Sequence, residues 1–467
     1  MLSHVAIYND RLIITDPTQE LRDFIQSELT YTDKSKQYQL RRMGKNLWQR
    51  NSPAYKQLQS EVNGALYEEI APDKVAMSSC FVELLKDKFN CNNSPLDLRS
   101  ETGKKIALPW VKKPYALRDY QEEAVDLMLH RSNYRGLINL ATGLGKTLIA
   151  THFIQRYKRR ALIVCPSESV AKQFYGQFVD CFGKNRVGFY GGGKKNICDI
   201  TVGIAASITK NIVEFQNADL GVVIFDETHH TPATTFFDIS KGLSATGKVF
   251  GLTATDYRSD GKDIMITGGC GPVLIRRDIP WGVKHGWLAE PYFFVRCVNT
   301  TGRDYKDDKT KSYKEHVLNS DLMKAQIRED ASKMMAAGKS VLILVDEVAH
   351  GKELSADLQI PFATGIDKKS QSYVDDLNNG KVCGLVGTDG KISEGTDTKN
   401  VDVLILANFV ASKGPVTQCV GRSLRKQGTK IRAIILDYIP MGSTMLSRHG
   451  FQRVEYYKEI TTNVKVI

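Results

Sequence analysis

The chain has 467 residues, too many for one ordinary core, and at roughly 100 to 200 residues per domain about three domains are expected. Its 42% hydrophobic and 25% charged residues are typical of a soluble globular protein. The excess of 64 Lys and Arg over 52 Asp and Glu, a net charge of +12, favours a polyanionic partner such as nucleic acid without identifying one.

Cysteine spacing and hydropathy argue against several other classes of protein. The nine cysteines include no Cys-x-x-Cys pair, so the sequence indicates neither a zinc site nor a disulfide framework. The N-terminal segment MLSHVAIYNDRLIITD carries charges where a signal peptide needs an apolar core. Since no stretch approaches the roughly 18 continuous apolar residues of a membrane span, we expect a cytoplasmic, nucleoid-associated protein with no membrane partner.

Residues 1–113 predict a small α+β domain. Short alternating apolar segments predict strands at residues 5–7 and 12–14. Apolar residues at helical spacing predict helices at residues 18–29 and 80–89.

Residues 34–60 contain seven basic residues and no acidic residue, with three aromatic residues between them. Basic side chains neutralise phosphates and aromatic side chains stack on exposed bases, so we expect an accessory nucleic-acid surface here. A solvated helix face with buried aromatic residues is the alternative interpretation. The side chains expected to contact DNA are Arg41, Arg42, Lys45 and Trp48.

From residue 114 the pattern changes to short apolar runs separated by helical stretches, which predicts parallel sheets covered by helices on both faces. The first series of runs ends near residue 252, and a second series begins at residue 341. Two α/β domains in tandem, residues 114–283 and 284–467, with a cleft between them, are the simplest interpretation.

The segment LATGLGKT at residues 140–147 follows a predicted strand and precedes a predicted helix, which is the context of a phosphate-binding loop, although a leucine replaces the usual first glycine. Gly143 and Gly145 let backbone N–H groups approach phosphates, and the helix N-terminus favours negative charge. We expect Lys146 to reach the β- and γ-phosphates and the Thr147 hydroxyl to bind Mg²⁺.

The sequence FDETHH at residues 225–230 ends an apolar strand of the same expected sheet. At the carboxyl edge of a parallel sheet, Asp226 can hold Mg²⁺ and Glu227 can orient and deprotonate an attacking water. A zinc site would need His229 and His230 to converge on one ion, which adjacent residues seldom do, and no His-Glu-x-x-His spacing is present. The expected cofactors are therefore ATP and Mg²⁺.

DETH resembles the DExH box of superfamily 2 helicases, and the other family motifs follow in order across residues 114–440. LRDYQ looks like the adenine-binding motif, ALIVCPS and ITVGIAASI resemble segments that touch the nucleic-acid backbone, and GLTAT is similar to the coupling motif. LVGTDGKISEGTD and QCVGRSLR look like the fifth and sixth motifs. The resemblance implies two tandem RecA-like parallel-sheet domains of the P-loop NTPase type.

The resemblance also gives individual residues a role. Those expected to bind the nucleotide are Arg118, Gln121, Thr142, Gly143, Gly145, Lys146, Thr147, Gly395 and Asp397. Those expected to couple ATP to DNA are His229, Thr253 and Thr255. Those expected to touch DNA in the core are Pro166, Ser167, Ser207 and Thr388. The catalytic set is Lys146, Asp226, Glu227, Gln418, Arg422 and Arg425. Taken singly, the weaker motifs could be helix caps or ordinary loops, and their joint order carries the assignment.

Arg422 and Arg425 are three residues apart, so on a helix they would share one face and could both point across the cleft at the γ-phosphate. Arginines in such a position stabilise transition-state charge by about 10³- to 10⁵-fold in known cases. A solvated basic helix face is the alternative.

The segments TATDYRSDG and GWLAEP look most like those of compact phage helicases of the UvsW kind, which implies branched DNA substrates and 3′ to 5′ movement. We therefore expect a monomeric ATP-dependent DNA helicase or translocase that unwinds or branch-migrates forks and junctions, in the host cytoplasm if it is phage-encoded. The alternatives are an RNA helicase, the motor subunit of a restriction complex, and a non-catalytic junction-binding protein.

Overall fold

The computed structural model divides into two compact units, one of residues 1–140 and 145–276 and the other of residues 141–144 and 277–467. The N-terminal domain and the first α/β sheet belong to the same unit. The structure describes residues 4–44, 50, 52–88, 95–227, 233–254, 263–306, 308–365, 367, 369–388, 398, 401–409, 413–426 and 430–467.

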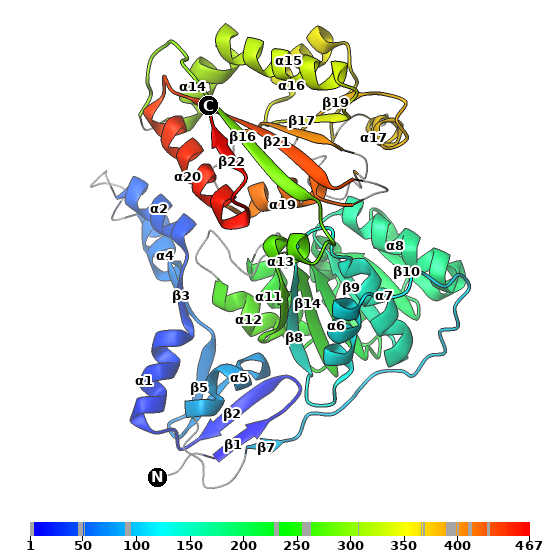
Figure 1. Ribbon diagram of the computed structural model, residues 1–467. Helices are drawn as coiled ribbons and strands as arrows, with labels where there is room; N and C mark the ends of the chain where they lie inside the picture. The colour runs from blue at the N-terminus through cyan, green and yellow to red at the C-terminus, as the bar shows by residue number, and fades with distance from the viewer. Residues whose placement is uncertain are drawn as a thin grey trace. The chain divides into compact units, whose positions relative to one another are not determined.

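The N-terminal domain is built on a five-stranded sheet of order β5-β6-β2-β1-β7, seen in blue in Figure 1. Its strands are β1 (His4–Ile7), β2 (Arg11–Thr15), β5 (Tyr67–Ala71), β6 (Lys74–Ser78) and β7 (Leu96–Asp97). Helix α1 (Gln19–Glu28) begins after Thr18, whose hydroxyl accepts from the N–H of Leu21 at 3.2 Å, and buries Leu21 and Ile25 in the domain core. The strands and this helix confirm the sequence predictions.

The helix expected at residues 80–89 is broken into short helical turns, η1 (Ser79–Phe81), α5 (Val82–Leu85) and η2 (Lys86–Lys88). Ser79, Cys80, Phe81 and Val82 are buried one after another, whereas Glu83 and Leu84 are exposed, a pattern that departs from the spacing of a regular amphipathic helix.

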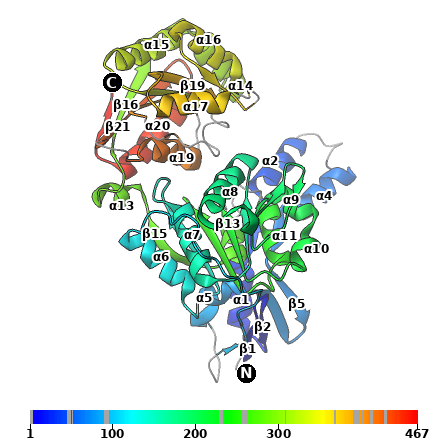
Figure 2. The same cartoon turned by 90° about the vertical axis from the view of Figure 1, so that its right-hand side faces the viewer.

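Helices α2 and α4 form a two-helix head between the strands of a ribbon, β3 (Thr30–Thr32) and β4 (Asn63–Ala65). Figure 1 shows both helices beyond β3, and Figure 2 shows the same two helices next to each other. Asp33 caps α2 (Lys34–Met43), and Ser52 caps α4 (Pro53–Glu61). Neither helix has a buried residue within its described part. The head therefore has little core of its own.

The first α/β domain is built on an eight-stranded sheet of order β11-β10-β12-β9-β13-β14-β8-β15. The registered pairs from β10 through β8 are all parallel. The strands are β8 (Arg135–Leu140), β9 (Ala161–Cys165), β10 (Val187–Gly191), β11 (Lys194–Lys195), β12 (Ile200–Ile204), β13 (Val222–Asp226), β14 (Lys248–Thr253) and β15 (Val273–Arg277). The helices are α6 (Asp119–Leu129), α7 (Lys146–Tyr157), α8 (Glu168–Phe182), α9 (Ala205–Lys210), α10 (Ile212–Gln216), α11 (Ala233–Gly242) and α12 (Asp263–Cys270).

Arg135, the first residue of β8, joins this sheet to the N-terminal domain. Its side chain is almost fully buried, and its guanidinium donates hydrogen bonds to five backbone carbonyls. Four belong to the first α/β domain, and the fifth is Asn9 O, in the turn between β1 and β2. The hydroxyl of Ser78, at the end of β6, donates to Gly268 O of α12 at 2.7 Å. These contacts hold the two sheets of the first unit together.

The second unit contains a seven-stranded sheet of order β18-β19-β17-β20-β21-β16-β22, and its registered strand pairs are parallel. The strands are β16 (Glu290–Val298), β17 (Val341–Val345), β18 (Phe362–Ala363), β19 (Gly384–Thr388), β20 (Val403–Ala407), β21 (Arg432–Pro440) and β22 (Val464–Val466). The helices are α13 (Ile279–Lys284), α14 (Lys309–Tyr313), η4 (Lys314–Leu318), α15 (Asp321–Ala336), α16 (Val348–Leu358), α17 (Ser370–Asn378), α19 (Lys413–Ser423) and α20 (Thr444–Ile460).

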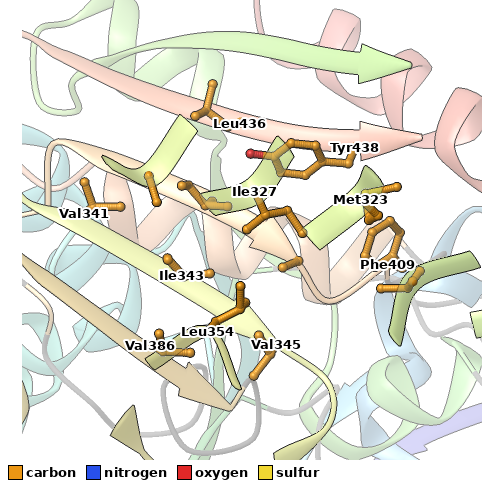
Figure 3. Close-up of a cluster of buried hydrophobic side chains, with 14 of the residues drawn as sticks. Met323, Ile327, Val341, Ile343, Val345, Leu354, Val386, Phe409, Leu436 and Tyr438 are labelled. Atoms are coloured by element: carbon orange, nitrogen blue, oxygen red, sulfur yellow. The ribbon is translucent and has the colours of Figure 1, made fainter. Parts of the chain in front are cut away.

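Figure 3 shows Met323 and Ile327 of α15 beside Ile343 and Val345 of β17 in the core of this unit.

The strand order and pairing in the two units confirm the expected α/β fold with two parallel sheets. Among the described residues, no helix combines the length and the apolar composition that crossing a lipid bilayer demands.

Candidate nucleotide-binding site

The phosphate-binding loop connects β8 to α7, as the sequence predicted. Gly143 and Gly145 have φ angles of 93° and 82°, in the left-handed region that favours glycine. A Cβ atom on Gly145 would lie 2.4 Å from Nε2 of Gln121, so the amide of Gln121 would have to shift to admit a side chain there. Helix α7 begins at Lys146, which leaves the first N–H groups of the helix available to an anion.

Lys146 and Glu227 are 81 residues apart in sequence and form an ion pair in the structure, with Nζ 3.0 Å from Oε1. Their side chains are only 10% and 17% exposed. Glu227 has a φ of 46°, which is strained for a residue with a side chain. This conformation follows β13 directly, and with it the Glu227 carboxylate meets the lysine of the phosphate-binding loop.

Asp226, the last residue of β13, is buried at the carboxyl edge of the sheet. Thr147 lies in the first turn of α7, at the same edge. Among the described residues, no group of three or more His, Cys, Asp or Glu side chains could hold a metal ion. A hydroxyl and a carboxylate suit Mg²⁺, which keeps several waters and takes further ligands from nucleotide phosphates.

Cys165 ends β9, the neighbouring strand, and is fully buried. Burial and, to a smaller extent, the charge of Asp226 raise the pKa of the Cys165 thiol well above its usual range. The thiol stays protonated at neutral pH, so Cys165 is a packing residue of this site and has no nucleophilic character.

Gln121 is buried at the start of α6, against the phosphate-binding loop. Its Oε1 accepts from the backbone N–H of Arg118 at 3.0 Å, and the Arg118 guanidinium donates to the Tyr120 hydroxyl at 3.2 Å. The structure therefore places Gln121 beside the loop, where its amide also caps α6. Adenine binding by Gln121 and Arg118 stays a prediction.

The predicted coupling and DNA residues that the structure describes lie at strand and helix ends. Thr253 ends β14 and is fully buried. Ser167 caps α8 by accepting from Val170 N at 3.5 Å, so its hydroxyl already has a structural role. Ser207 lies in α9, directly after β12, and Thr388 ends β19 of the second unit. Pro166 precedes Ser167, and Thr142 is buried in the phosphate-binding loop.

Several predicted site residues lie outside the described part of the chain. These are Lys45, Trp48, His229, Thr255, Gly395 and Asp397, together with the side chain of Gln418. Their roles stay predictions.

A turn at the same sheet edge was missed in the sequence analysis. Gly191, Gly192 and Gly193 have φ angles of 140°, 56° and 81°, and Lys194 and Lys195 follow them in β11. A Cβ on Gly192 would lie 3.2 Å from the carboxylate of Glu168, the first residue of α8. The run YGGGKK was the available signal, because three glycines before two lysines favour a left-handed turn with basic side chains.

Arg422 and Arg425 do not both belong to a helix, which corrects the argument that they share one helical face. Helix α19 ends at Ser423, and Arg425 instead forms an isolated β-bridge with Leu288. The N–H of Ala289, just before β16, donates to Leu424 O at 2.8 Å, so the first carbonyl after the helix has a partner outside it. Arg422 lies in the last turn of α19, and its proposed action on the γ-phosphate stays a prediction.

Comparison with known proteins supports the motif assignments. Residues 114–258 match the family model described as "Type III restriction enzyme, res subunit". The "ATP-dependent DNA helicase uvsW" of Enterobacteria phage T4 is 26% identical over 383 residues, which cover 73% of this chain and 74% of that protein. The "DNA 3'-5' translocase XPB2" of Sulfurisphaera tokodaii is 34% identical over 178 residues, which cover 37% of this chain but only 38% of that protein.

The fold itself is shared with solved structures. Dbp5 of S. cerevisiae, bound to RNA and ADP BeF3, superimposes with a TM-score of 0.55 at 13% identity, over 75% of this chain and 89% of that one. The matched segment of the first sheet, the two parallel sheets and the similarity to uvsW of phage T4 therefore support the resemblance of the chain to superfamily 2 helicases.

Proposed function

We propose that the protein is an ATP-dependent DNA helicase or translocase that acts on forked and junction DNA. The observation that carries the proposal is the Lys146–Glu227 pair, held beside the glycine turns of the phosphate-binding loop at the carboxyl edge of the first α/β sheet. This arrangement supplies both a cation for the phosphates and a carboxylate for the attacking water.

Lys146 changes partner when ATP binds. In the structure its ammonium pairs with Glu227 Oε1, and the β- and γ-phosphates offer it a stronger, more negative partner. Transfer of Lys146 to the phosphates frees Glu227 to orient a water in line with the γ-phosphorus. The water oxygen bonds to phosphorus, the bond to the β,γ-bridging oxygen breaks, and Glu227 takes the proton.

Thr147 and Asp226 are the residues that would hold Mg²⁺. The ion, when bound, neutralises charge that develops on the phosphate oxygens. We also propose that Arg422 completes the site from the second unit during hydrolysis, and that Thr253, His229 and Thr255 relay the state of ATP to the DNA contacts.

The proposed DNA path runs over the carboxyl edge of the first sheet. Ser167, Ser207 and the Gly191–Gly193 turn lie at this edge, where exposed Lys194 and Lys195 add positive charge. Thr388 is the corresponding contact of the second unit, and the two-helix head, with exposed Arg41 and Arg42, is the accessory surface. Movement in the 3′ to 5′ direction and branch migration are supported by the translocase and uvsW resemblances.

The test is ATP hydrolysis and strand separation by the purified protein on forks, four-way junctions, linear duplexes, single-stranded DNA and RNA. We expect Lys146→Ala and Glu227→Gln to lower DNA-stimulated hydrolysis by at least about 100-fold, because each removes a group that acts on the phosphates. Glu227→Gln should still bind ATP.

The control is Lys184→Ala, because Lys184 is an exposed lysine of the same unit. This variant should hydrolyse ATP at the wild-type rate. Undiminished hydrolysis in Glu227→Gln contradicts the proposed chemistry. Stimulation by RNA in preference to DNA would instead favour an RNA helicase. Chromatographic sizing with light scattering tests whether the active form is a monomer.

A further inference from the structure

Lys430 occupies an unusual place for a lysine in the second unit. It lies between the end of α19 and the start of β21, and its ammonium is turned inward. Nζ donates hydrogen bonds to the backbone carbonyls of Ser423 and Val401. Burial lowers the pKa of Lys430 to about 8, although the charge of Asp402 opposes the shift. The Lys430 ammonium is thus held away from water by hydrogen bonds to two backbone carbonyls.

The two carbonyls belong to elements that matter for the sixth motif. Ser423 is the last residue of α19 and directly follows Arg422. Val401 is buried just before β20, the strand next to β17 in the middle of the sheet. Lys430 therefore ties the last turn of α19 to the central part of the sheet.

The other carbonyls at this helix end have different partners. Val420 O accepts from the Ser423 hydroxyl at 2.7 Å and from Leu424 N at 3.2 Å, whereas Leu424 O accepts from Ala289 N at 2.8 Å. Ser423 O accepts from the Lys430 ammonium. A cation at this position also offsets the negative end of the helix dipole.

We propose that Lys430 is a positioning residue for Arg422, which fixes the last turn of α19 so that the arginine has one orientation when it meets the γ-phosphate. The proposal rests on the proposed function, because it assumes that Arg422 acts on ATP. Arg422 has a long side chain, so a small rotation of the helix end moves its guanidinium by more than it moves the backbone. Misplacement of a catalytic group by 1 Å can reduce a rate about 100-fold.

A purely structural anchor predicts a different result. If Lys430 only stabilised the fold, its loss would lower the unfolding temperature and the fraction of folded protein, while each folded molecule would hydrolyse ATP at the normal rate. A positioning residue changes kcat of the folded enzyme and leaves ATP binding alone, since Lys146 and Gln121, which hold ATP in our proposal, belong to the first unit.

The experiment compares Lys430→Met, Lys430→Arg and Arg422→Ala by DNA-stimulated hydrolysis, affinity for a fluorescent ATP analogue, and thermal unfolding. For Lys430→Met we expect kcat to fall about 10- to 100-fold, with KM for ATP and analogue affinity within about twofold of wild type. Lys430→Arg keeps a donor and a charge and should recover part of kcat. Lys426→Met, an exposed lysine just past the same helix, is the matched control and should have normal kcat.

The double variant Lys430→Met with Arg422→Ala decides whether Lys430 acts through Arg422. It should be no slower than Arg422→Ala alone, because a misplaced arginine cannot matter once the arginine is gone. The proposal is overturned if the fold-loss of kcat in the double variant equals the product of the two single losses. Normal kcat in folded Lys430→Met also overturns it. If Lys430→Met does not fold, Lys430→Arg takes its place in the same cycle. Normal kcat in Arg422→Ala would instead refute the proposed role of Arg422.

Discussion

Glu227 and Gly145 illustrate how single backbone conformations build the site. Glu227 accepts a left-handed conformation despite its side chain, and its carboxylate meets Lys146. Gly145 also has a left-handed φ angle, and the amide of Gln121 would have to shift to admit a side chain there. Backbone strain at Glu227 and crowding at Gly145 both help to place the groups that surround the phosphates.

Gly145→Ala should lower ATP affinity at least about tenfold and destabilise the first unit. The matched control is Gly338→Ala, since Gly338 has a φ of 71° but nothing within 4 Å of an added Cβ. The control measures backbone strain alone, about 1 to 2 kcal/mol in the free energy of unfolding. Gly145→Ala should cost more than this, measured by urea denaturation. Equal costs would show that Gln121 does not crowd the loop.

Sequence patterns predict candidate catalytic residues because the chemistry of these residues is local. A lysine after glycines and two acids after an apolar run are recognisable without any long-range information. The pairing of Lys146 with Glu227, the capping role of Gln121 and the ring of carbonyls around Arg135 depend on residues far apart in the chain. These contacts could not be predicted from the sequence.

At the scale of elements, continuous apolar runs gave clear strand predictions. β13 and β17 are continuous apolar runs, fully buried in parallel sheets, and the sequence analysis identified both. β16 alternates between buried and partly exposed residues, and it lies between the two series of apolar runs that the sequence analysis recognised. The helices of the two-helix head lack a buried face, so hydrophobic periodicity gave no signal for them.

Lys248 joins two elements of the first domain. This first residue of β14 is fully buried, and its ammonium donates to the carbonyls of His130 and Asn133, at the end of α6, at 2.9 and 2.8 Å. The rings of Tyr134, Tyr157 and Phe250 lie within 6 Å of it. Burial lowers the pKa of Lys248 to about 8.

Deprotonation of Lys248 in the folded state should therefore add to the free energy of unfolding as the pH rises above 8. Because buried Lys430 and Cys165 have shifted pKa values as well, this contribution is measured as the difference between wild type and Lys248→Met. Below pH 8 Lys248 is protonated in both states, whereas between 8 and its unfolded value of about 10.4 only the unfolded chain holds the proton. Between pH 8 and 9.5 the gain should be about 1 to 2 kcal/mol, measured by urea denaturation. The difference in the free energy of unfolding between wild type and Lys248→Met should grow by this amount over that range, and a difference that does not change with pH would contradict the assignment.

At the scale of the molecule, the two-helix head can be removed without cutting the N-terminal sheet. Thr32 of β3 pairs with Asn63 of β4, so an Asn-Gly turn in place of residues 33–62 would close the ribbon into a hairpin. We expect the shortened protein to bind forks and four-way junctions at least about tenfold more weakly, with a weaker dependence on salt, because phosphate contacts of the head are lost.

Hydrolysis stimulated by single-stranded DNA should stay within about twofold of the wild type, since the proposed core path is intact. Arg41→Ala with Arg42→Ala in the full-length chain should reproduce part of the loss of junction binding. Unchanged junction affinity in the shortened protein would show that the head has another role.

The guanidinium of Arg135 has a consequence for experiments on isolated fragments. A protein that starts at residue 114 would keep every helicase motif but would lose Asn9, whose carbonyl accepts one of the arginine's hydrogen bonds. The buried guanidinium would lose one of its acceptors, next to the strand that leads into the phosphate-binding loop, and the Ser78–Gly268 contact would be lost with it. Weak hydrolysis by such a fragment would therefore reflect damage to the ATP-hydrolysing domain itself. It would not show that the N-terminal domain contributes to DNA binding.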